Sequence, residues 1–428
     1  MLDLYLFIAS IFFYGFGKLN DSLPITVSNG LIFICFAYHV AGSVKKGYIY
    51  YSPFLIIFLL YALLSTILNI GSGSTFDKIQ FFIYFFIYSF TAIAVVKKHD
   101  TETLIKAYMA FCFVISAIAV IQVSGDFAGL NFVNDMLRAL SENKNSSYSG
   151  GLLRATSIAS EPALLGIYLL PATAISIYRL LNISEVKKYS STKISITIII
   201  ATLLTFSLVS YISLMMIVFS AIAKKNNIKA IAAILIILSA LYAAATSVES
   251  INSRLTEVTA SSGLASSDNL SVIAFNSNLK VTIYGLSENL FFGTGITSHP
   301  EKFDRFVGLF YSASTPGIGL NKDDAASMIL RLLSELGIIG LVLYYHPAML
   351  HLFRAKKESN HIVQSAFFIS FILYGIRYGS INTPMHWLYF SVFFTLHSAG
   401  LRRFRFSEPA RFSAISTFYK NKHKNSQS

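Results

Sequence analysis

The charged residues with the clearest chemical potential are a few arginines and carboxylates beside long apolar segments. Arg154 precedes Pro162, where an apolar segment begins, by eight residues. We expect its guanidinium to lie near the headgroup plane of a membrane, where it can hold a phosphate through two parallel hydrogen bonds; a solvated loop arginine is the alternative. Glu161 directly precedes Pro162. It either caps the free amides of the predicted helix or supplies a carboxylate to a site.

A second group of charges lies between residues 280 and 377. Its members are Lys280, Arg305, the pair Asp323-Asp324, Arg331, Glu335 and Arg377. Asp324, Met328, Arg331 and Glu335 recur at helical spacing, so we expect them to share one helix face. Charges at membrane depth are costly and usually mark a bundle interior, a water-filled cavity or a functional path. An Arg331–Glu335 pair that only tolerates burial is the alternative.

Motifs of common metal- and nucleotide-dependent enzymes are missing from the sequence. It has no HExxH motif and no P-loop, and Gly293-Thr294-Gly295 lacks the third glycine of a dinucleotide fingerprint. Cys35 and Cys112 both lie in apolar segments, which does not support a disulfide or a metal cluster. We therefore expect no metal and no cofactor. Arginine, lysine and carboxylate together suit the binding of an anionic lipid headgroup and the activation of a neutral nucleophile.

The composition indicates a membrane protein. Of the 428 residues, 54% are hydrophobic and 13% are charged, against about 25% charged in an average globular chain. So few charges could not cover the surface of a water-soluble enzyme of this length. The net charge is +13, but Lys and Arg recur in small clusters between apolar runs, so nucleic-acid binding is disfavoured.

The apolar segments that must position the charged residues are mostly long enough to cross a bilayer, which takes about 20 residues. They fall near 2–17, 24–43, 53–70, 79–96, 103–124, 162–181, 194–223, 229–247, 326–350, 361–378 and 384–400. Segment 194–223 would be about 45 Å long as one helix, too long for a hydrocarbon core of about 30 Å. The lysine clusters at its two ends belong on the same cytoplasmic side. We therefore expect two short helices that meet near residues 207–211.

This pattern predicts an all-α polytopic membrane protein with about 12 transmembrane helices and both termini in the cytoplasm. Residues 1–401 form a single transmembrane domain, and the basic tail 402–428 is expected to be disordered. Two loops on the outer face are long, about 125–161 and 248–325. Long loops without continuous secondary structure tend to be functional. The first contains Leu130, Val133, Leu137 and Leu140 at helical spacing, which predicts a short amphipathic helix.

Three stretches carry a resemblance to a known family. They are Arg154 through Glu161-Pro162 to Gly166, the apolar–glycine element Asn289-Leu290-Phe291-Phe292-Gly293-Thr294-Gly295, and the helix start from Ser327 to Leu341. With them the chain resembles the O-antigen polymerase and ligase superfamily of bacterial envelope glycosyltransferases. These proteins move glycans carried on undecaprenyl pyrophosphate at the outer face of the inner membrane.

The sequence departs from the family pattern at three places. Ligases of the superfamily place a histidine near the start of the helix in the third stretch. This chain has Asp323-Asp324-Ala325-Ala326-Ser327 there. A second arginine commonly precedes the apolar–glycine element, where this chain has Lys280. A Ser-Arg at the middle hairpin is replaced by Ser210-Tyr211. The missing histidine favours a polymerase over a ligase.

The resemblance implies an inverting, metal-independent O-antigen polymerase in the bacterial inner membrane, with its two long loops in the periplasm. It would join oligosaccharide repeats carried on undecaprenyl pyrophosphate, in lipopolysaccharide biosynthesis. The pyrophosphate would be held by Arg154, Lys280, Arg305 and Arg331, the proton would go to Glu161, Asp323 or Asp324, and Glu335 and Arg377 would support them. Membrane lipids are expected partners, and a chain-length regulator protein is left open as another.

Two alternatives remain. One is an O-antigen ligase that transfers finished glycan to a lipid A-core acceptor. The other is a twelve-span secondary transporter, although such carriers commonly show related halves and the sequence has no apparent internal repeat.

Overall fold

The computed structural model describes residues 1–15, 18–20, 23–130, 132–140, 148–149, 152–225, 270–312, 315, 317–354, 361–396 and 401–405. This part of the chain is mostly helical. Five of its helices are long and apolar enough to cross a membrane: α2 (Val27–Lys46), α4 (Thr75–Lys98), α5 (Thr101–Phe127), α7 (Pro162–Leu180) and the Met328–Leu350 part of α14 (Met328–Arg354). These lengths and compositions are those of a helical membrane protein.

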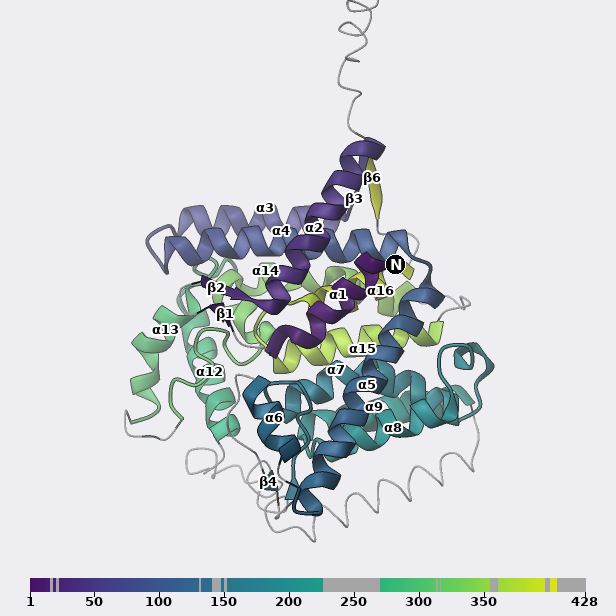
Figure 1. Cartoon of the computed structure of the whole chain (residues 1–428). Coiled ribbons are helices and arrows are strands. Elements are labelled where there is room, and N and C mark those ends of the chain that lie inside the picture. Colours follow the sequence, from purple (N-terminus) through teal and green to yellow (C-terminus); the bar gives the residue numbers. More distant parts are fainter. Residues whose placement is uncertain are drawn as a thin grey trace, which may run out of the picture.

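Shorter helices and strands complete the described fold (Figure 1). The shorter helices are α1 (Leu2–Phe12), α3 (Pro53–Leu68), α6 (Phe132–Leu140), α8 (Thr192–Leu204), α9 (Leu208–Lys225), α12 (Leu270–Leu286), α13 (His299–Phe306), α15 (His361–Arg377) and α16 (Pro384–Leu396). Three antiparallel strand pairs join β1 (Lys18–Asn20) to β2 (Leu23–Thr26), β3 (Tyr48–Tyr51) to β6 (Arg402–Arg405), and β4 (Tyr148–Ser149) to β5 (Leu152–Leu153). Single 3-10 turns lie at Phe13–Gly15, Ser184–Val186 and Val307–Leu309.

Polar residues at the segment ends define where several helices begin and end. The side chains of Thr26, Ser52, Ser74, Asp100 and Ser191 each accept a hydrogen bond from a backbone amide in the first turn of the helix that follows. At its other end, α2 stops at Gly47, whose φ of 71° is left-handed, and lysines occupy the last turns of α2 and α4.

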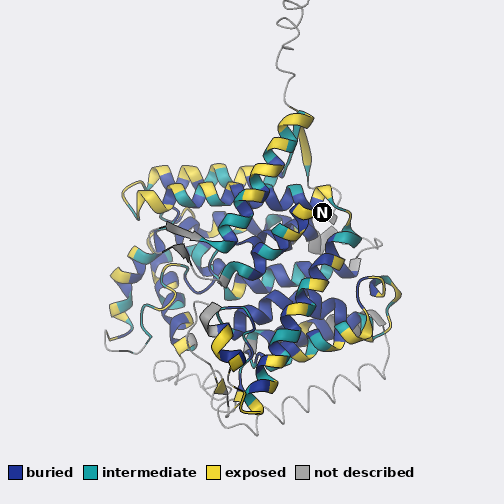
Figure 2. Cartoon of the chain, in the orientation of Figure 1, coloured by how far each residue is buried: buried dark blue, intermediate teal, exposed yellow. Residues whose placement is uncertain are grey.

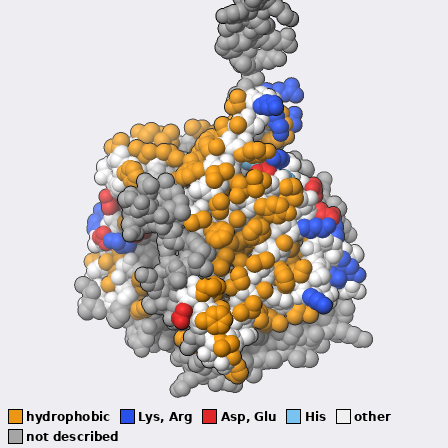
Figure 3. All heavy atoms as spheres, viewed as in Figure 1, with side chains coloured by type: hydrophobic (Ala, Val, Ile, Leu, Met, Phe, Trp, Pro, Cys, Tyr) orange, Lys and Arg blue, Asp and Glu red, His pale blue; other side chains and the backbone are white. Residues whose placement is uncertain are grey.

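Helix α7 lies at the centre of the bundle. Nearly all of its residues are buried, and it packs against α5, α8, α9 and α15. Figure 2 shows that the buried residues lie in the interior, while α3, α4 and α5 each have exposed residues along one side. On the face seen in Figure 3, hydrophobic side chains form a broad band between two margins where Lys, Arg, Asp and Glu gather. Such a band is the surface that a helical membrane protein presents to lipid.

Helix α4 runs from one end of the bundle to the other, and other described segments contact one another at each of these two ends (Figure 1). At the cavity end (residues 69–74, 289–298, 319–327 and 378–383), Ser72 Oγ donates to the carbonyl of Thr294 over 2.6 Å. At the Asp3 end (residues 1–3, 97–102 and 184–191), Lys98 Nζ lies 3.0 Å from Asp3 Oδ2. Segments that the sequence places on one face of the membrane therefore contact one another.

Most predicted segments appear as helices within a few residues of their expected bounds. Segment 194–223 is two helices, α8 and α9, which break at Thr205–Ser207 as expected. The predicted segment 229–247, the first part of the loop 248–325 (residues 248–269) and the tail after Arg405 lie outside the described residues. The mostly helical structure agrees with the predicted all-α class, to which the fold adds three short strand pairs. One expectation is wrong in detail: the expected disordered tail begins with β6, because its first residues pair with β3.

Candidate functional site

Helix α14 is broken at Gly337. Its backbone has φ 65° and ψ −169°, a region open essentially only to glycine. A Cβ atom at this position would lie 2.4 Å from the carbonyl oxygen of Phe291, so the chain there approaches the loop 289–295 at backbone distance. The break divides α14 into residues 328–336 and residues 338–354.

Polar groups from three other segments bond the backbone that the break leaves without helical partners. The contacts are Lys302 Nζ to Ser334 O (2.6 Å), Thr294 N and Gly295 N to Glu335 O (3.0 and 2.8 Å), Tyr61 Oη to Leu336 O (2.9 Å), Ile338 N to Leu290 O (3.0 Å) and Ile339 N to Phe291 O (3.3 Å). Irregular backbone in a membrane helix requires such partners, since lipid offers none. The apolar–glycine element is thus the segment that completes the hydrogen bonding of α14.

The first half of α14 carries the predicted charged pair. Arg331 Nε lies 3.1 Å from Glu335 Oε1, and the Glu335 side chain is 1% exposed, so the pair that was the alternative interpretation of these two charges is present. Asp324 does not lie on this helix face, contrary to the expectation from its spacing. It lies before the helix, where Ala325 and Ala326 both have left-handed φ values and turn the chain into α14.

Two buried basic side chains of α13 support this half-helix. His299 Nε2 lies 2.9 Å from Asn278 Oδ1 and its Nδ1 lies 2.9 Å from Ser334 Oγ. Burial lowers the pKa of His299 to about 3, so the ring is neutral. Burial also lowers the pKa of Lys302 to about 8, while Glu288 and Glu335 oppose the shift. A cation at the C-terminal end of a half-helix interacts favourably with its carbonyls.

A cavity of about 160 Å³ lies where α1, α7, α15 and α16 meet the loops of the cavity end. Ser160, Asp324, Tyr378 and Ser380 are among its polar lining residues. The Tyr378 hydroxyl donates to Glu161 Oε1, and Arg377 Nη2 lies 3.9 Å from the same oxygen. Burial raises the pKa of Asp324, and Arg331 and Arg377 oppose this effect. Asp324 is therefore the charged residue that lines this cavity, and Glu161 and Arg377 contact its lining residue Tyr378.

A larger cavity of about 410 Å³ shares the lining residues Tyr14 and Ser380 with the smaller one. Its charged lining residues are Asp77 and Arg331. The other members are Thr26, Asn29, Gln80, Phe81, Tyr84, Tyr88, Thr297 and Asn382. Arg331 thus reaches the larger cavity while its partner Glu335 is buried in the bundle.

The remaining predicted site residues line neither cavity. Arg154 Nε donates to the carbonyl of Thr205 over 3.3 Å, at the junction of α8 and α9. Lys280 Nζ lies over the rings of Tyr311 and Phe310, and Arg305 pairs with Glu288. Asp323 is exposed. Glu161 occupies the N-cap position of α7, but its side chain makes no capping bond, so the capping interpretation is wrong.

Sequence reasoning missed several residues that the fold brings to the cavities. Tyr378 follows Arg377 directly, and its hydroxyl orients Glu161. Tyr14, Thr297 and Ser380 are neutral residues outside any charged pattern, so only the tertiary arrangement identifies them. Lys302 lies in the loop that was expected to be functional. It was missed because the sequence shows a lysine in a short segment but does not show that the fold buries it.

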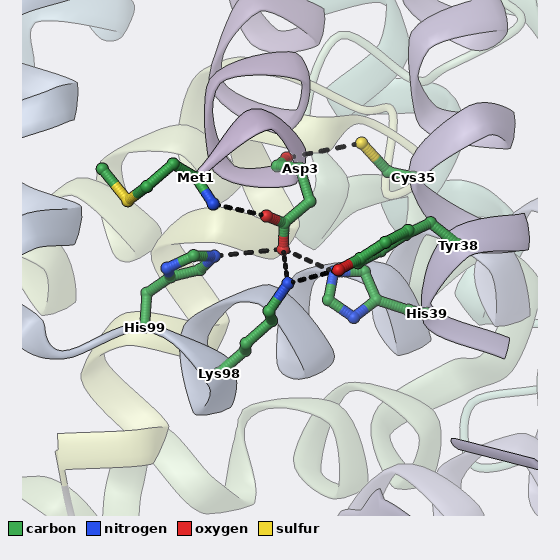
Figure 4. Close-up of polar contacts among 7 residues, drawn as sticks. All are labelled: Met1, Asp3, Cys35, Tyr38, His39, Lys98 and His99. Carbon is green, nitrogen blue, oxygen red and sulfur yellow. Dashed lines mark hydrogen bonds and ion pairs between the residues drawn. The ribbon is translucent and has the colours of Figure 1, made fainter. Parts of the chain in front are cut away.

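A second buried charged cluster lies at the Asp3 end (Figure 4). The Asp3 side chain is 5% exposed and lies within 3.2 Å of four nitrogens from three segments. These belong to the Met1 amino group, His39, Lys98 and His99. Cys35 Sγ also donates to the carbonyl of Asp3. The cluster joins α1 to α2 and to the junction between α4 and α5.

Comparison of the chain with protein-family models and with curated proteins found no match. The geometry of the cavity end and the three sequence stretches are therefore the basis for a functional assignment. Fold alone would not provide one, because function resides in specific sites.

Proposed function

We propose that the chain is a membrane glycosyltransferase that polymerises oligosaccharide repeats carried on undecaprenyl pyrophosphate. The observation that carries the proposal is the cavity of about 160 Å³ lined by Asp324, with Glu161 and Arg377 at its Tyr378 wall. Arg331 lines the adjoining cavity. Guanidinium groups suit a pyrophosphate, and a half-buried carboxyl with a raised pKa suits the acceptance of a proton.

The transfer needs a leaving group and a proton acceptor. The bond between the donor sugar's anomeric carbon and the pyrophosphate oxygen breaks, and its electron pair leaves with the pyrophosphate. Arg331 and Arg377 stabilise the negative charge that develops there. The acceptor hydroxyl oxygen bonds to the anomeric carbon from the opposite face, which inverts its configuration, and its proton goes to Asp324. Glu161 holds Arg377 and Tyr378 in place.

The proposal places this chemistry on the periplasmic face of the bacterial inner membrane, with both termini in the cytoplasm. It is supported by the separation of the two ends of the bundle. The loops expected outside contact one another at the cavity end, and the lysine-rich segments expected inside meet at the Asp3 end. Membrane lipids and a chain-length regulator protein are the proposed partners.

Two observations favour a polymerase over the alternatives. His299, which lies beside α14, has both ring nitrogens engaged and a pKa lowered to about 3, so it does not suit the role of the ligase histidine. Secondary transporters bind substrate near the middle of the membrane at a repeat interface. Here the sequence has no apparent internal repeat, and both cavities are lined by residues of several helices together with loop residues of the cavity end.

Deletion of the gene tests the proposal. The surface polysaccharide should then lose its ladder of lengths and carry at most one repeat, as read on a gel; an unchanged ladder would refute polymerisation. Two neighbouring carboxylates provide a matched test of the base. Asp324→Asn should fail to restore the ladder, whereas Asp323→Asn should restore it, because Asp323 is exposed and lines neither cavity. Restoration by both variants would remove Asp324 from the mechanism.

A further inference from the structure

The larger cavity contains groups that the proposed transfer does not use. Apart from Arg331, its lining comes from the turn after α1, from α2 and α4, and from Thr297 and Asn382. Its volume of about 410 Å³ falls within the roughly 300–1,000 Å³ typical of ligand sites. None of the sequence stretches that carry the family resemblance includes Asp77, Gln80 or Asn382.

Two buried polar atoms of this lining have no hydrogen-bond partner within the described part of the chain. They are Thr297 Oγ1 and Asn382 Oδ1. The Asn382 amide nitrogen donates to the carbonyl of Phe81 over 3.1 Å, which fixes the orientation of the amide. A buried polar atom left unpaired is destabilising. Such atoms in a cavity wall point to a bound group that supplies the missing hydrogen bonds.

The surrounding structure holds Thr297 in a strained backbone conformation. Its φ is +64°, an outlier for a β-branched residue. The tight packing extends to Gly73, where an added Cβ would lie 2.7 Å from the carbonyl oxygen of Thr297. Strained residues of this kind cluster at ligand sites, where the surrounding structure maintains them.

The chemistry of the lining selects the class of ligand. Amides from Asn29, Gln80 and Asn382 accompany tyrosine hydroxyls and ring faces, and the two charges, Asp77 and Arg331, are opposite in sign. Arg331 is already assigned to the leaving pyrophosphate, and the other charged residue of this lining, Asp77, would repel a phosphate in the rest of the cavity. A sugar presents hydroxyls that both donate and accept hydrogen bonds and C–H faces that pack on aromatic rings. These features match the lining.

We propose that the larger cavity binds the acceptor saccharide, with Asp77, Thr297 and Asn382 as its hydrogen-bonding groups. The inference rests on the proposed glycosyl transfer, and it adds the position of the acceptor. Because the two cavities share Tyr14 and Ser380, a sugar in the larger one presents a hydroxyl toward the cavity that Asp324 lines.

Saturation-transfer NMR on the purified full-length protein in nanodiscs tests this site. The probes are free hexoses, 6-deoxyhexoses and N-acetylhexosamines, with inorganic pyrophosphate as a competitor. At least one sugar should bind the wild type, and Asn382→Leu and Asp77→Asn should each weaken that binding at least about tenfold, as about 1.4 kcal/mol corresponds to a factor of ten. Equal sugar binding by wild type and Asn382→Leu would overturn the proposal. So would a wild type that binds no sugar of the panel, or displacement of the sugar by pyrophosphate at the larger cavity.

Thr297→Val separates a ligand role from a structural one. The hydroxyl has no hydrogen-bond partner among the described residues, so its removal should leave the melting temperature unchanged or raised while sugar binding falls. A lowered melting temperature with unchanged sugar binding would contradict the proposal. Asp324→Asn should bind the sugar normally and lose polymerisation. If it polymerises normally while sugar binding still depends on Asn382, the catalytic assignment fails and the saccharide site stands.

Discussion

The two buried charged clusters at opposite ends of the bundle differ in what their polar groups bind. Around Asp3, one carboxylate is surrounded by nitrogens of the same chain, and three segments are joined. Around Arg331, the charged groups border two cavities, and neighbouring polar atoms of Thr297 and Asn382 have no partner among the described residues. Burial of charge alone therefore does not distinguish the two clusters. The adjoining cavities distinguish the Arg331 cluster.

The largest expected effect is a difference in polymerisation between variants of Arg331 and Arg305, two arginines that the sequence analysis assigned the same role. Arg331→Gln should lower polymerisation at least about 100-fold, because one electrostatic donor to a developing negative charge is worth that much. Arg305→Gln should change it little, since Arg305 forms an exposed pair with Glu288. The assay is the length ladder at equal protein level. Similar losses of polymerisation in both variants would contradict the specific role of Arg331 in the transfer.

Substitution of Asp3 should lower the stability of the protein and leave its activity unchanged. Asp3→Asn leaves the surrounding cationic groups without their carboxylate, and we expect a loss of about 3 kcal/mol in the free energy of unfolding. Lys98 is 31% exposed, which keeps the cost at the lower end of the range for buried pairs. Unfolding in detergent measures the change. Activity per folded molecule should stay near the wild-type value, and its selective loss would show that this end also takes part in function.

The break in α14 should depend on its glycine. Gly337→Ala places a Cβ against the Phe291 carbonyl in a backbone region that alanine disfavours, and we expect a cost of about 1–3 kcal/mol from the backbone conformation, with the clash in addition. Gly42→Ala in α2 is the control, because nothing lies within 4 Å of its added Cβ. Thermal unfolding compares the two. Equal stability of both variants would mean that the loop 289–295 does not hold α14 in this form.

The last expected effect is a pH dependence at Lys302. Its folded-state pKa of about 8 lies below its ordinary value of 10.5, so the unfolded chain binds more protons between these limits. The free energy of unfolding should therefore rise between about pH 8 and pH 10.5. Lys302→Met should remove this contribution, and Lys322→Met should retain it, because Lys322 pairs with Asp304 at the surface. A wild type without any rise would contradict the burial of this lysine as an ammonium group.

The helices were predictable because apolar runs and capping residues are local features. The junction of α8 and α9 was also predictable, since lysines at both ends of one long apolar run require two crossings. The break at Gly337 was not, because Leu336-Gly337-Ile338 reads as an ordinary apolar helix and only the loop 289–295 and Tyr61 reveal the interruption.

The site was predictable in part. Arg331, Glu335, Asp324, Glu161 and Arg377 were identified because charge is rare in this chain, and they lie at or beside the cavities. Lys280 and Arg305 share that rarity, but their side chains contact aromatic rings and Glu288 instead. Neutral residues such as Thr297 carry no signal until α2, α4 and the loops are brought together.

The break in α14 also constrains the order in which the chain is assembled. A helix with unbonded amides and carbonyls cannot remain in hydrocarbon, because each such group costs several kcal/mol. The groups that bond them come from α3, the loop 289–295 and α13, all of which the ribosome makes before α14. Biosynthesis from the N-terminus thus supplies the partners before the broken helix enters the bilayer, and a permuted chain that made α14 first would lack them.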